Sequence, residues 1–351
     1  MTPEIIAHRG ASYLAPENTL SAFRKAMEIG ADGVEMDVQQ TSDKKLVIHH
    51  DFVIDWHTDM RGQIYDMTEG ELKARDFGRG KDASYNDERT STLQEALALC
   101  REMEGTVVQL ELKATIDNDP DFVPRVIEEI RAADITDRLV VISFNHDLLR
   151  QAKQLMPELK VGVLVYGALE TMALPTSTWE MLGLQNGLEE DDFPQLPPLS
   201  VENVDDENCS WALRWMGNQI SMLQANFPGK SLVEVAQRLL EQRDPVKYVQ
   251  TLDFKPDWVS CEYHTAYQQP SMVQKLHDLG IKAAYFWPLQ PDVIGTNRPD
   301  RVRECISELE MTEYRAEAAS LRCGLIPQVT SEKQTADSLQ AVRCCAMQKM
   351  L

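Results

Sequence analysis

Short β-rich runs alternate with helical periods along the first 165 residues of the chain. The alternation predicts strands at 4–7, 33–38, 107–112, 139–143 and 160–165, and helices at 17–29, 92–99, 122–132 and 148–156. Strands joined by helices at this spacing pair in parallel through right-handed crossovers. Because no dinucleotide-type glycine loop is present, we predict an α/β fold of the closed TIM (β/α)8 barrel type, with an open doubly wound sheet as the alternative.

The βα pattern resumes after a long interruption. Further strands are predicted at 258–262, 282–287 and 292–296, and helices at 211–225, 232–242 and 271–279, which brings the barrel to eight strands. Residues 168–255 therefore form an insertion after strand 5, and its stretch 189–207 holds eight carboxylates and no Lys or Arg. We assign 1–308 to the barrel domain and 309–351 to a helical C-terminal tail.

The link between the last two predicted strands is unusually short. Only the four residues from Pro288 to Pro291 separate them, whereas a parallel crossover needs about ten to twelve. We therefore expect an irregular closure between strands 7 and 8, unless one of these two strands is misplaced.

The charge balance limits the partners of the chain. Its 35 Lys and Arg face 56 Asp and Glu, a net charge of −21, which excludes a general nucleic-acid binder and requires any phosphate chemistry to be local and metal-assisted.

No run approaches the roughly 18 to 20 apolar residues of a membrane span, and the opening MTPEIIAHRG has no apolar signal-peptide core. Seven scattered cysteines without CxxC spacing favour reduced thiols. We expect a cytoplasmic protein without an integral membrane segment, and its charge leaves open both a monomer and a dimer with a neutral interface.

Polar residues stand at the predicted carboxyl ends of the early strands, where the active sites of such barrels lie. They are His8 and Arg9 after the first strand, Glu35 and Asp37 in the second, His50 after the apolar run 46–49, and Glu111 and Lys113 at the end of the next strand. Residues two apart on a strand share a face. Since polar groups that face a core are costly unless partnered, we expect these side chains to converge on one rim.

Three carboxylates at one rim favour a hard divalent cation, Mg²⁺ or Ca²⁺, over zinc, which prefers imidazole and thiolate ligands. Two histidines there can divide the general-base and general-acid roles, while Arg9 and Lys113 hold phosphate oxygens. This set suits the cleavage of a phosphodiester. Each part also has a structural alternative: an exposed acidic face, a same-face ion pair between Glu111 and Lys113, or a histidine that serves packing.

The same residues resemble the motifs of the glycerophosphodiester phosphodiesterases, over roughly residues 4–308 and in the order of that family. The similar segments are His8-Arg9-Gly10, Pro16-Glu17-Asn18-Thr19, Glu35-x-Asp37, His50-Asp51 and Glu111-x-Lys113, with further ones at 91–95, 143–144 and 296–300. Members of the family are TIM barrels of lipid and glycerol metabolism. They hydrolyse glycerophosphodiesters to glycerol 3-phosphate and an alcohol with a divalent metal.

The resemblance implies a role for each rim residue. It implies that Glu35, Asp37 and Glu111 bind the metal. It also implies that His8 and His50 are the acid/base pair, without deciding which is the base, and that Arg9 and Lys113 contact phosphate. Asn18 or Thr19 would start the first helix.

Two stretches depart from the family pattern. The family usually continues with Asp-Arg-Thr-Thr after its His-Asp pair, whereas here Asp55 is followed by Trp56 and His57. We interpret His57 as a solvated loop histidine rather than as an extra ligand. The family also has Trp-Thr-Val-Asn after its seventh strand, where this chain has Trp287 followed by proline. Trp287 is a candidate wall of the substrate pocket.

Two other functions compete with this interpretation. A lysophospholipase D would act on lysophospholipids and needs an apolar groove for the acyl chain, for which the insertion is long enough. A non-catalytic binding protein on a degenerate barrel would account for the short closure, but the complete set of rim residues argues against it.

Overall fold

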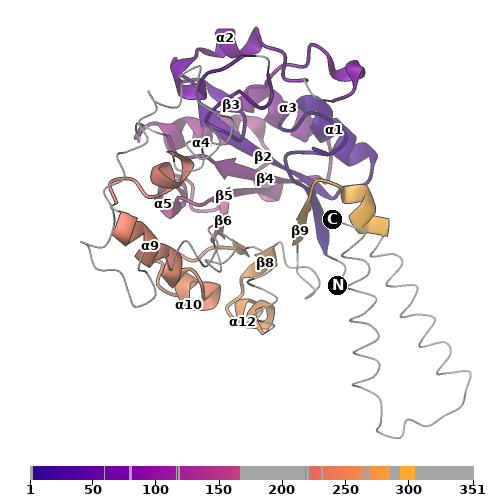
Figure 1. Ribbon diagram of the computed structural model, residues 1–351. Coiled ribbons are helices and arrows are strands. Elements are labelled where there is room, and N and C mark those ends of the chain that lie inside the picture. The colour runs from indigo at the N-terminus through magenta and orange to yellow at the C-terminus, as the bar shows by residue number, and fades with distance from the viewer. Residues whose placement is uncertain are drawn as a thin grey trace, which may run out of the picture.

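The structure is a computed structural model that describes residues 3–58, 60–78, 81–115, 117, 119–166, 218, 221–230, 232–261, 265, 269, 271–284 and 293–304. Its strands form one sheet with helices around it (Figure 1). They are β1 (Glu4–Ala7), β2 (Gly33–Gln40), β3 (Leu46–Ile48), β4 (Val107–Leu112), β5 (Leu139–Ser143), β6 (Lys160–Leu164), β7 (Trp258–Ser260), β8 (Lys282–Ala284) and β9 (Val293–Thr296).

Parallel pairing runs from β1 through β2, β4, β5, β6, β7, β8 and β9, and β9 pairs again with β1. The predicted TIM-type barrel is therefore confirmed, and the open sheet is wrong. β3 lies outside this ring, because it pairs antiparallel with the end of β2. The antiparallel run returns the chain to the barrel mouth, where the His49 N–H donates to the carbonyl oxygen of Asp37 at 2.9 Å.

Side chains cap the first turn of some, but not all, of the helices. They are α1 (Leu20–Glu28), α2 (Glu69–Lys73), α3 (Leu93–Glu102), α4 (Phe122–Ala133), α5 (His146–Leu155), α9 (Leu232–Glu241), α10 (Pro245–Val249) and α12 (Met272–Asp278), with 3-10 turns at Ile64–Asp66, Ala83–Tyr85 and Thr136–Arg138. Thr68 and Thr92 cap α2 and α3 in reciprocal capping boxes with Glu71 and Glu95. The helices expected from periodicity around α1, α3, α4, α5, α9 and α12 are confirmed, whereas sequence periodicity predicts neither α2 nor α10.

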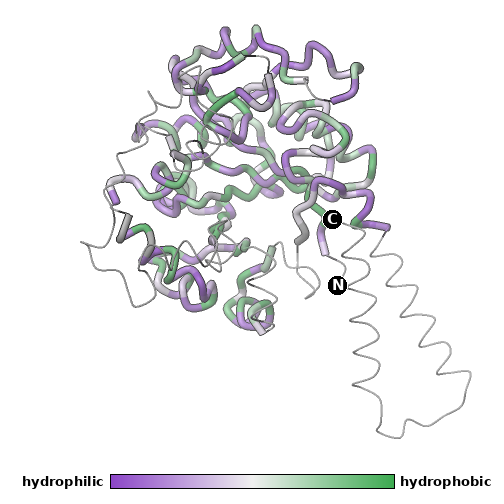
Figure 2. The backbone as a smooth tube through the Cα atoms, viewed as in Figure 1, coloured by the Kyte–Doolittle hydropathy of each residue, from purple (hydrophilic) through white to green (hydrophobic). Residues whose placement is uncertain are grey.

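Residues alternate between two hydrophobic layers along the strands. Val34, Met36, Val108 and Leu110 pack with helix residues in the main core outside the barrel. A second cluster fills the barrel interior and consists of Ile6, Val140, Ile142, Leu164, Trp258 and Ala284. Figure 2 shows hydrophobic residues along the central strands and many hydrophilic residues over the outer loops. Since full burial of one large apolar side chain contributes about 1.5–3 kcal/mol, these layers hold the strand ends in place.

The closure between β8 and β9 is minimal. These strands share one residue pair, Ala284 with Val293, whereas β9 and β1 share four. Both predicted strands are present, although β8 ends at Ala284 rather than at the predicted residue 287, so neither is misplaced, and the irregular closure consists in their single shared pair. The linking residues 285–292, which include Trp287, lie outside the described residues.

The insertion is described in its second half. Residues 218 and 221–226 are helical, and α9 and α10 follow. The His146 ring at the start of α5 contacts the Tyr248 hydroxyl of α10 at 2.8 Å, which ties the insertion to the barrel. The acidic stretch 189–207 and the tail 309–351 lie outside the described residues, and the domain boundaries stay predictions.

Within the described ranges, no helix combines the length and apolar character that crossing a membrane requires.

Candidate active site

Three carboxylates meet at the carboxyl ends of β2 and β4. Glu35 and Asp37 share one face of β2, and Glu111 lies on the neighbouring β4, where parallel register sets it beside Asp37. One oxygen from each of the three carboxylates lies within 4.8 Å of the other two. Within the described ranges this is the only such cluster of His, Cys, Asp and Glu. The convergence expected from the strand spacing is thus present in the structure.

Burial makes this concentration of negative charge costly. Glu35 is 1% exposed, Asp37 0% and Glu111 8%. Burial, reinforced by the neighbouring carboxylates, holds the pKa of Glu35 well above its usual range. Burial raises the pKa of Glu111 to about 7 against the opposing charge of Lys113. Burial also disfavours ionised Asp37, but the nearby cations, Lys113 first, hold the pKa of that carboxyl far below its usual range.

The donor set fits a divalent cation. Three carboxylate groups offer the hard oxygen ligands that Mg²⁺ and Ca²⁺ prefer, and the cluster contains no thiolate or imidazole ligand. Because burial and the neighbouring carboxylates raise the pKa values of Glu35 and Glu111, an added cation would favour the ionised form of both.

Two cations already contact the carboxylates. The Lys113 ammonium lies 2.6 Å from Glu111 Oε1 and 3.0 Å from Asp37 Oδ1, and its side chain is 5% exposed. The same-face ion pair of Glu111 with Lys113 is therefore present alongside the cluster. Arg9 Nη1 lies 3.0 Å from Glu17 Oε1, and Arg9 Nε lies 3.8 Å from Asp37 Oδ2.

A tight turn brings Arg9 to the cluster. Arg9 and Gly10 both have left-handed backbones, with φ of 57° and 77°, and the Arg9 N–H donates to Glu35 Oε2 at 2.8 Å. A Cβ atom on Gly10 would lie 2.7 Å from the Cβ of Ala22 in α1. Only glycine allows the turn to press against this helix.

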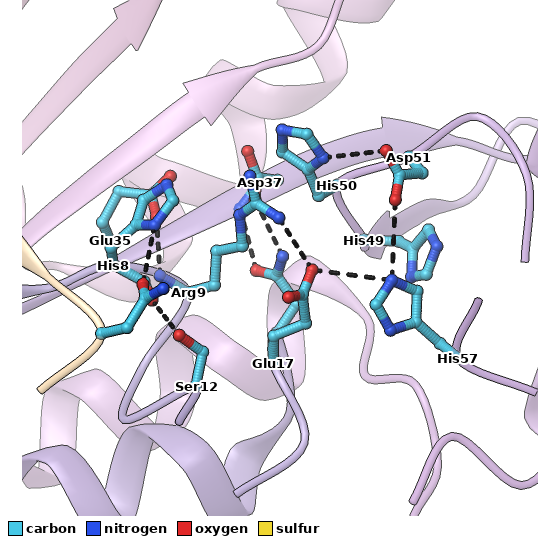
Figure 3. A network of polar contacts seen from close by, with 12 residues as sticks. His8, Arg9, Ser12, Glu17, Glu35, Asp37, His49, His50, Asp51 and His57 are labelled. Carbon is cyan, nitrogen blue, oxygen red and sulfur yellow. Dashed lines mark hydrogen bonds and ion pairs between the residues drawn. The ribbon is translucent and has the colours of Figure 1, made fainter. Parts of the chain in front are cut away.

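Both candidate acid/base histidines are held through Nδ1. His8 Nδ1 lies 2.9 Å from Asn297 Oδ1, and His50 Nδ1 lies 3.1 Å from Asp51 Oδ1 (Figure 3). Burial, followed by the charge of Arg9, lowers the pKa of His8 to about 4. Burial also lowers the pKa of His50. In both rings Nε2 makes no hydrogen bond to a described residue, so that atom is available to another partner.

Asn18 is a site residue that sequence reasoning missed. Its Nδ2 donates to Asp37 Oδ2 at 2.8 Å, and its Oδ1 accepts from the Asp37 N–H at 3.2 Å. Asn18 is 2% exposed and has a φ of 56°. The capping role considered for it belongs to Thr19, which accepts from the Ala22 N–H. The available signal was its place in the Pro16 to Thr19 motif, which does not reveal the Asp37 contact.

Comparison with known proteins identifies the family. A family model described as the glycerophosphoryl diester phosphodiesterase family matches residues 8–187, just over half of the chain. The chain belongs to this family. Most of the predicted site residues lie within the matched segment.

The curated relatives match part of their length. The glycerophosphodiester phosphodiesterase of Caldanaerobacter subterraneus subsp. tengcongensis is 40% identical over 160 residues, which cover 46% of this chain and 65% of that protein. Human glycerophosphodiester phosphodiesterase 1 is 33% identical over 162 residues, which cover 40% of this chain and 48% of the human protein. The matched segment thus spans between about half and two thirds of these relatives.

Solved structures of the family share the fold over most of the chain. A phosphodiesterase of Oleispira antarctica, solved in complex with the product sn-glycerol 3-phosphate, has a TM-score of 0.58 and 22% identity, and covers 87% of this chain and 97% of that one. A putative glycerophosphodiester phosphodiesterase of Galdieria sulphuraria has a TM-score of 0.56 and 20% identity, with 85% and 95% covered. These likenesses show the barrel fold.

His57, at which the chain departs from the pattern of the glycerophosphodiester phosphodiesterases, lies in a loop as expected but is only partly exposed to solvent. Its side chain is 22% exposed, and its ring packs T-shaped on His49 with centroids 5.1 Å apart. Its Nε2 lies 3.6 Å from Glu17 Oε1 and 3.6 Å from Asp51 Oδ2. The turn in which the Thr58 N–H bonds to the Ile54 carbonyl folds His57 inward. His57 is also no member of the carboxylate cluster.

Trp287, the candidate pocket wall of this glycerophosphodiester phosphodiesterase family member, lies outside the described residues. Its role in substrate binding stays a prediction.

Proposed function

We propose that this protein hydrolyses glycerophosphodiesters to glycerol 3-phosphate and an alcohol, with a divalent metal and two histidines as acid and base. The observation that carries the proposal is one barrel mouth that combines three clustered carboxylates with two histidines anchored through Nδ1. Membership of the phosphodiesterase family supports it. The substrate is a small molecule, and we place the reaction in the cytoplasm.

Proton transfer is the task of the two histidines. In hydrolysis the phosphorus–oxygen bond to the alcohol breaks, and a hydroxyl of water, or first of the glycerol itself, adds to phosphorus. One histidine takes the proton of the attacking hydroxyl through Nε2, and the other gives a proton to the leaving oxygen. Asp51 behind His50 stabilises the imidazolium form of that ring, as a carboxylate accepting from Nδ1–H does.

Charge stabilisation is the task of the cations. Glu35, Asp37 and Glu111 would hold the divalent cation, which when bound supplies positive charge against the phosphate oxygens. Arg9 and Lys113 would add guanidinium and ammonium donors to the same oxygens. Lys113 then shares its three donors between substrate and the carboxylates that it contacts in the structure.

The decisive experiment is a product assay. Purified protein is incubated with glycerophosphocholine, glycerophosphoinositol or a lysophospholipid, each with EDTA, Mg²⁺ or Ca²⁺, and released glycerol 3-phosphate and free alcohol are measured. We expect metal-dependent release of glycerol 3-phosphate from the glycerophosphodiesters. Release of choline from the lysophospholipid alone would replace the proposal by a lysophospholipase D.

The matched variants are His50→Ala and His277→Ala. His277 is exposed on α12, whose carboxyl end leads into the start of β8 at the other end of the barrel. We expect His50→Ala to lower kcat by about 10²- to 10⁴-fold, the usual contribution of a general acid or base, and His277→Ala to match the wild type. Folded protein that turns over none of these substrates with any metal would favour the non-catalytic binding protein.

A further inference from the structure

Both carboxylate oxygens of Asp51 lie close to side-chain nitrogens. Its Oδ1 accepts from His50 Nδ1 at 3.1 Å and from Asn218 Nδ2 at 2.9 Å. Its Oδ2 faces His57 Nε2 at 3.6 Å (Figure 3). Asp51 is 8% exposed, so water does little to hold its orientation. The direction of the Asp51 carboxylate, and with it that of the His50 ring, is therefore set by Asn218 and His57.

Asn218 reaches this place from the insertion. It stands 167 residues from Asp51 in the chain and is 3% exposed. While its Nδ2 donates to Asp51, its Oδ1 accepts from the Phe52 N–H at 3.0 Å. One amide thus contacts the backbone and the side chain of adjacent residues, which fixes the loop directly after His50 in two directions.

His57 reaches the same carboxylate from the opposite side. The edge-to-face contact with His49 sets its ring plane, and the His49 Nε2 is in turn fixed by the Val53 carbonyl oxygen at 3.2 Å. His57 Nε2 also faces Glu17, whose carboxylate holds Arg9 at 3.0 Å. His57 therefore stands between the carboxylate behind His50 and the carboxylate that holds Arg9.

We infer that Asn218 and His57 are positioning residues that orient Asp51 and, through it, present His50 Nε2 to the substrate. The inference rests on the proposed function for its effect on turnover. It gives the insertion a part in catalysis, although the insertion supplies none of the rim residues. It also gives a role to a histidine at which the chain departs from the family pattern.

The first test is steady-state kinetics on glycerophosphocholine with the activating metal. We expect His57→Ala and Asn218→Leu each to lower kcat by about tenfold to a hundredfold, less than loss of His50 itself, with KM changed by less than about threefold. His57→Gln keeps an N–H near the position of Nε2 and should recover most of the loss. Asn218→Asp still accepts from the Phe52 N–H but sets a like charge against Asp51, and it should lose at least as much as Asn218→Leu. Gln224→Ala, at an exposed position of the same helical segment, is the matched control.

The second test is a double-mutant cycle with His50→Ala. If Asn218 and His57 act through His50, adding His57→Ala or Asn218→Leu to His50→Ala lowers kcat no further. The inference is overturned if the two losses multiply, or if an active wild type loses less than about twofold in both single variants. If Asn218 served only to hold the backbone of Phe52, Asn218→Asp would have the kcat of the wild type.

A third readout does not depend on turnover. In ¹⁵N NMR of the histidine rings, we expect wild-type His50 to be the Nδ1–H tautomer, and both His57→Ala and Asn218→Leu to populate the other tautomer. An unchanged tautomer in the folded variants overturns the inference. If the substitutions shift the His50 tautomer but the wild type hydrolyses no phosphodiester, the proposed function fails while the positioning of His50 stands.

Discussion

Replacement of Glu111 by its neutral isostere glutamine tests the electrostatics of the carboxylate cluster. Burial raises the pKa of Glu111 from 4.5 to about 7 in the folded protein, so the folded state binds this proton more tightly than the unfolded state does. The resulting contribution to stability is fully present below the unfolded pKa and is lost as the pH rises through the folded pKa. Glutamine resembles the protonated carboxyl and does not titrate. The wild type should therefore lose stability relative to Glu111→Gln as the pH rises.

The size of the effect follows from the two pKa values. The interval from 4.5 to about 7 corresponds to about 3 kcal/mol, at about 1.36 kcal/mol per pH unit. Because the unfolded carboxyl is already largely ionised at about pH 5, roughly 2 to 3 kcal/mol of this remains between about pH 5 and about pH 8. We expect the free energy of unfolding of the wild type, minus that of Glu111→Gln, to fall by this amount in EDTA.

The assay is guanidinium unfolding followed by circular dichroism across that pH range. Subtracting the free energy of unfolding of the variant cancels the contribution from titration of the buried histidines, which is common to both proteins. Glu102→Gln, at an exposed position at the end of α3, is the control and should give a constant difference. Saturating Mg²⁺ or Ca²⁺ should abolish the fall, because a cation on the cluster keeps Glu111 ionised. A difference for Glu111→Gln that stays constant with pH in EDTA would refute the reasoning.

Further predictions concern the other parts of the site and the barrel closure. Lys113→Met leaves the buried charge of Asp37 without its nearest cation, so we expect the free energy of unfolding in EDTA to fall by about 3–5 kcal/mol. Adding Glu111→Gln to this variant should restore part of that free energy. On a substrate with a p-nitrophenol leaving group, the kcat deficit should shrink for only one of His8→Ala and His50→Ala, because only the general acid protonates the leaving oxygen; equal behaviour of both variants would contradict a division of roles. Asn18→Leu should weaken Mg²⁺ binding, measured by calorimetry, by about tenfold to a hundredfold, since it frees the Asp37 carboxylate. Amide hydrogens of β8 and β9 should exchange faster than those of β2 and β4 because one residue pair joins the former strands; equal protection would refute this.

The fold could be predicted because its signals are local. Alternating apolar residues mark the strands, and helical periods with threonine caps mark the helices between them, so the order of elements alone implies a parallel barrel. The helices that periodicity does not predict are short: α2 and α10 have five residues each, too few for a helical period to appear. The antiparallel return of β3 depends on its pairing with β2, a contact that no local pattern specifies.

The candidate site could be predicted only where strand register fixes it. Glu35, Asp37 and Glu111 stand at strand positions whose faces are set by the alternation, so their convergence follows from parallel pairing. The partners of His8 and Asp51 come from distant parts of the chain: Asn297 stands 289 residues from His8, and Asn218 167 residues from Asp51. At such separations, spacing carries no information about contact.

The groups proposed for chemistry occupy neighbouring strands of the ring, from β9 through β1 and β2 to β4, together with the loop that follows β3. The opposite arc, β5 to β8, supplies apolar interior side chains and carries the insertion after β6. The barrel thus separates the half that carries the groups proposed for chemistry from the half that carries the insertion. Asn218 crosses from the second half to the first, where it contacts the Asp51 carboxylate and the Phe52 N–H. A change in the insertion that moved Asn218 would therefore reach the loop behind His50 without altering any of the three carboxylates.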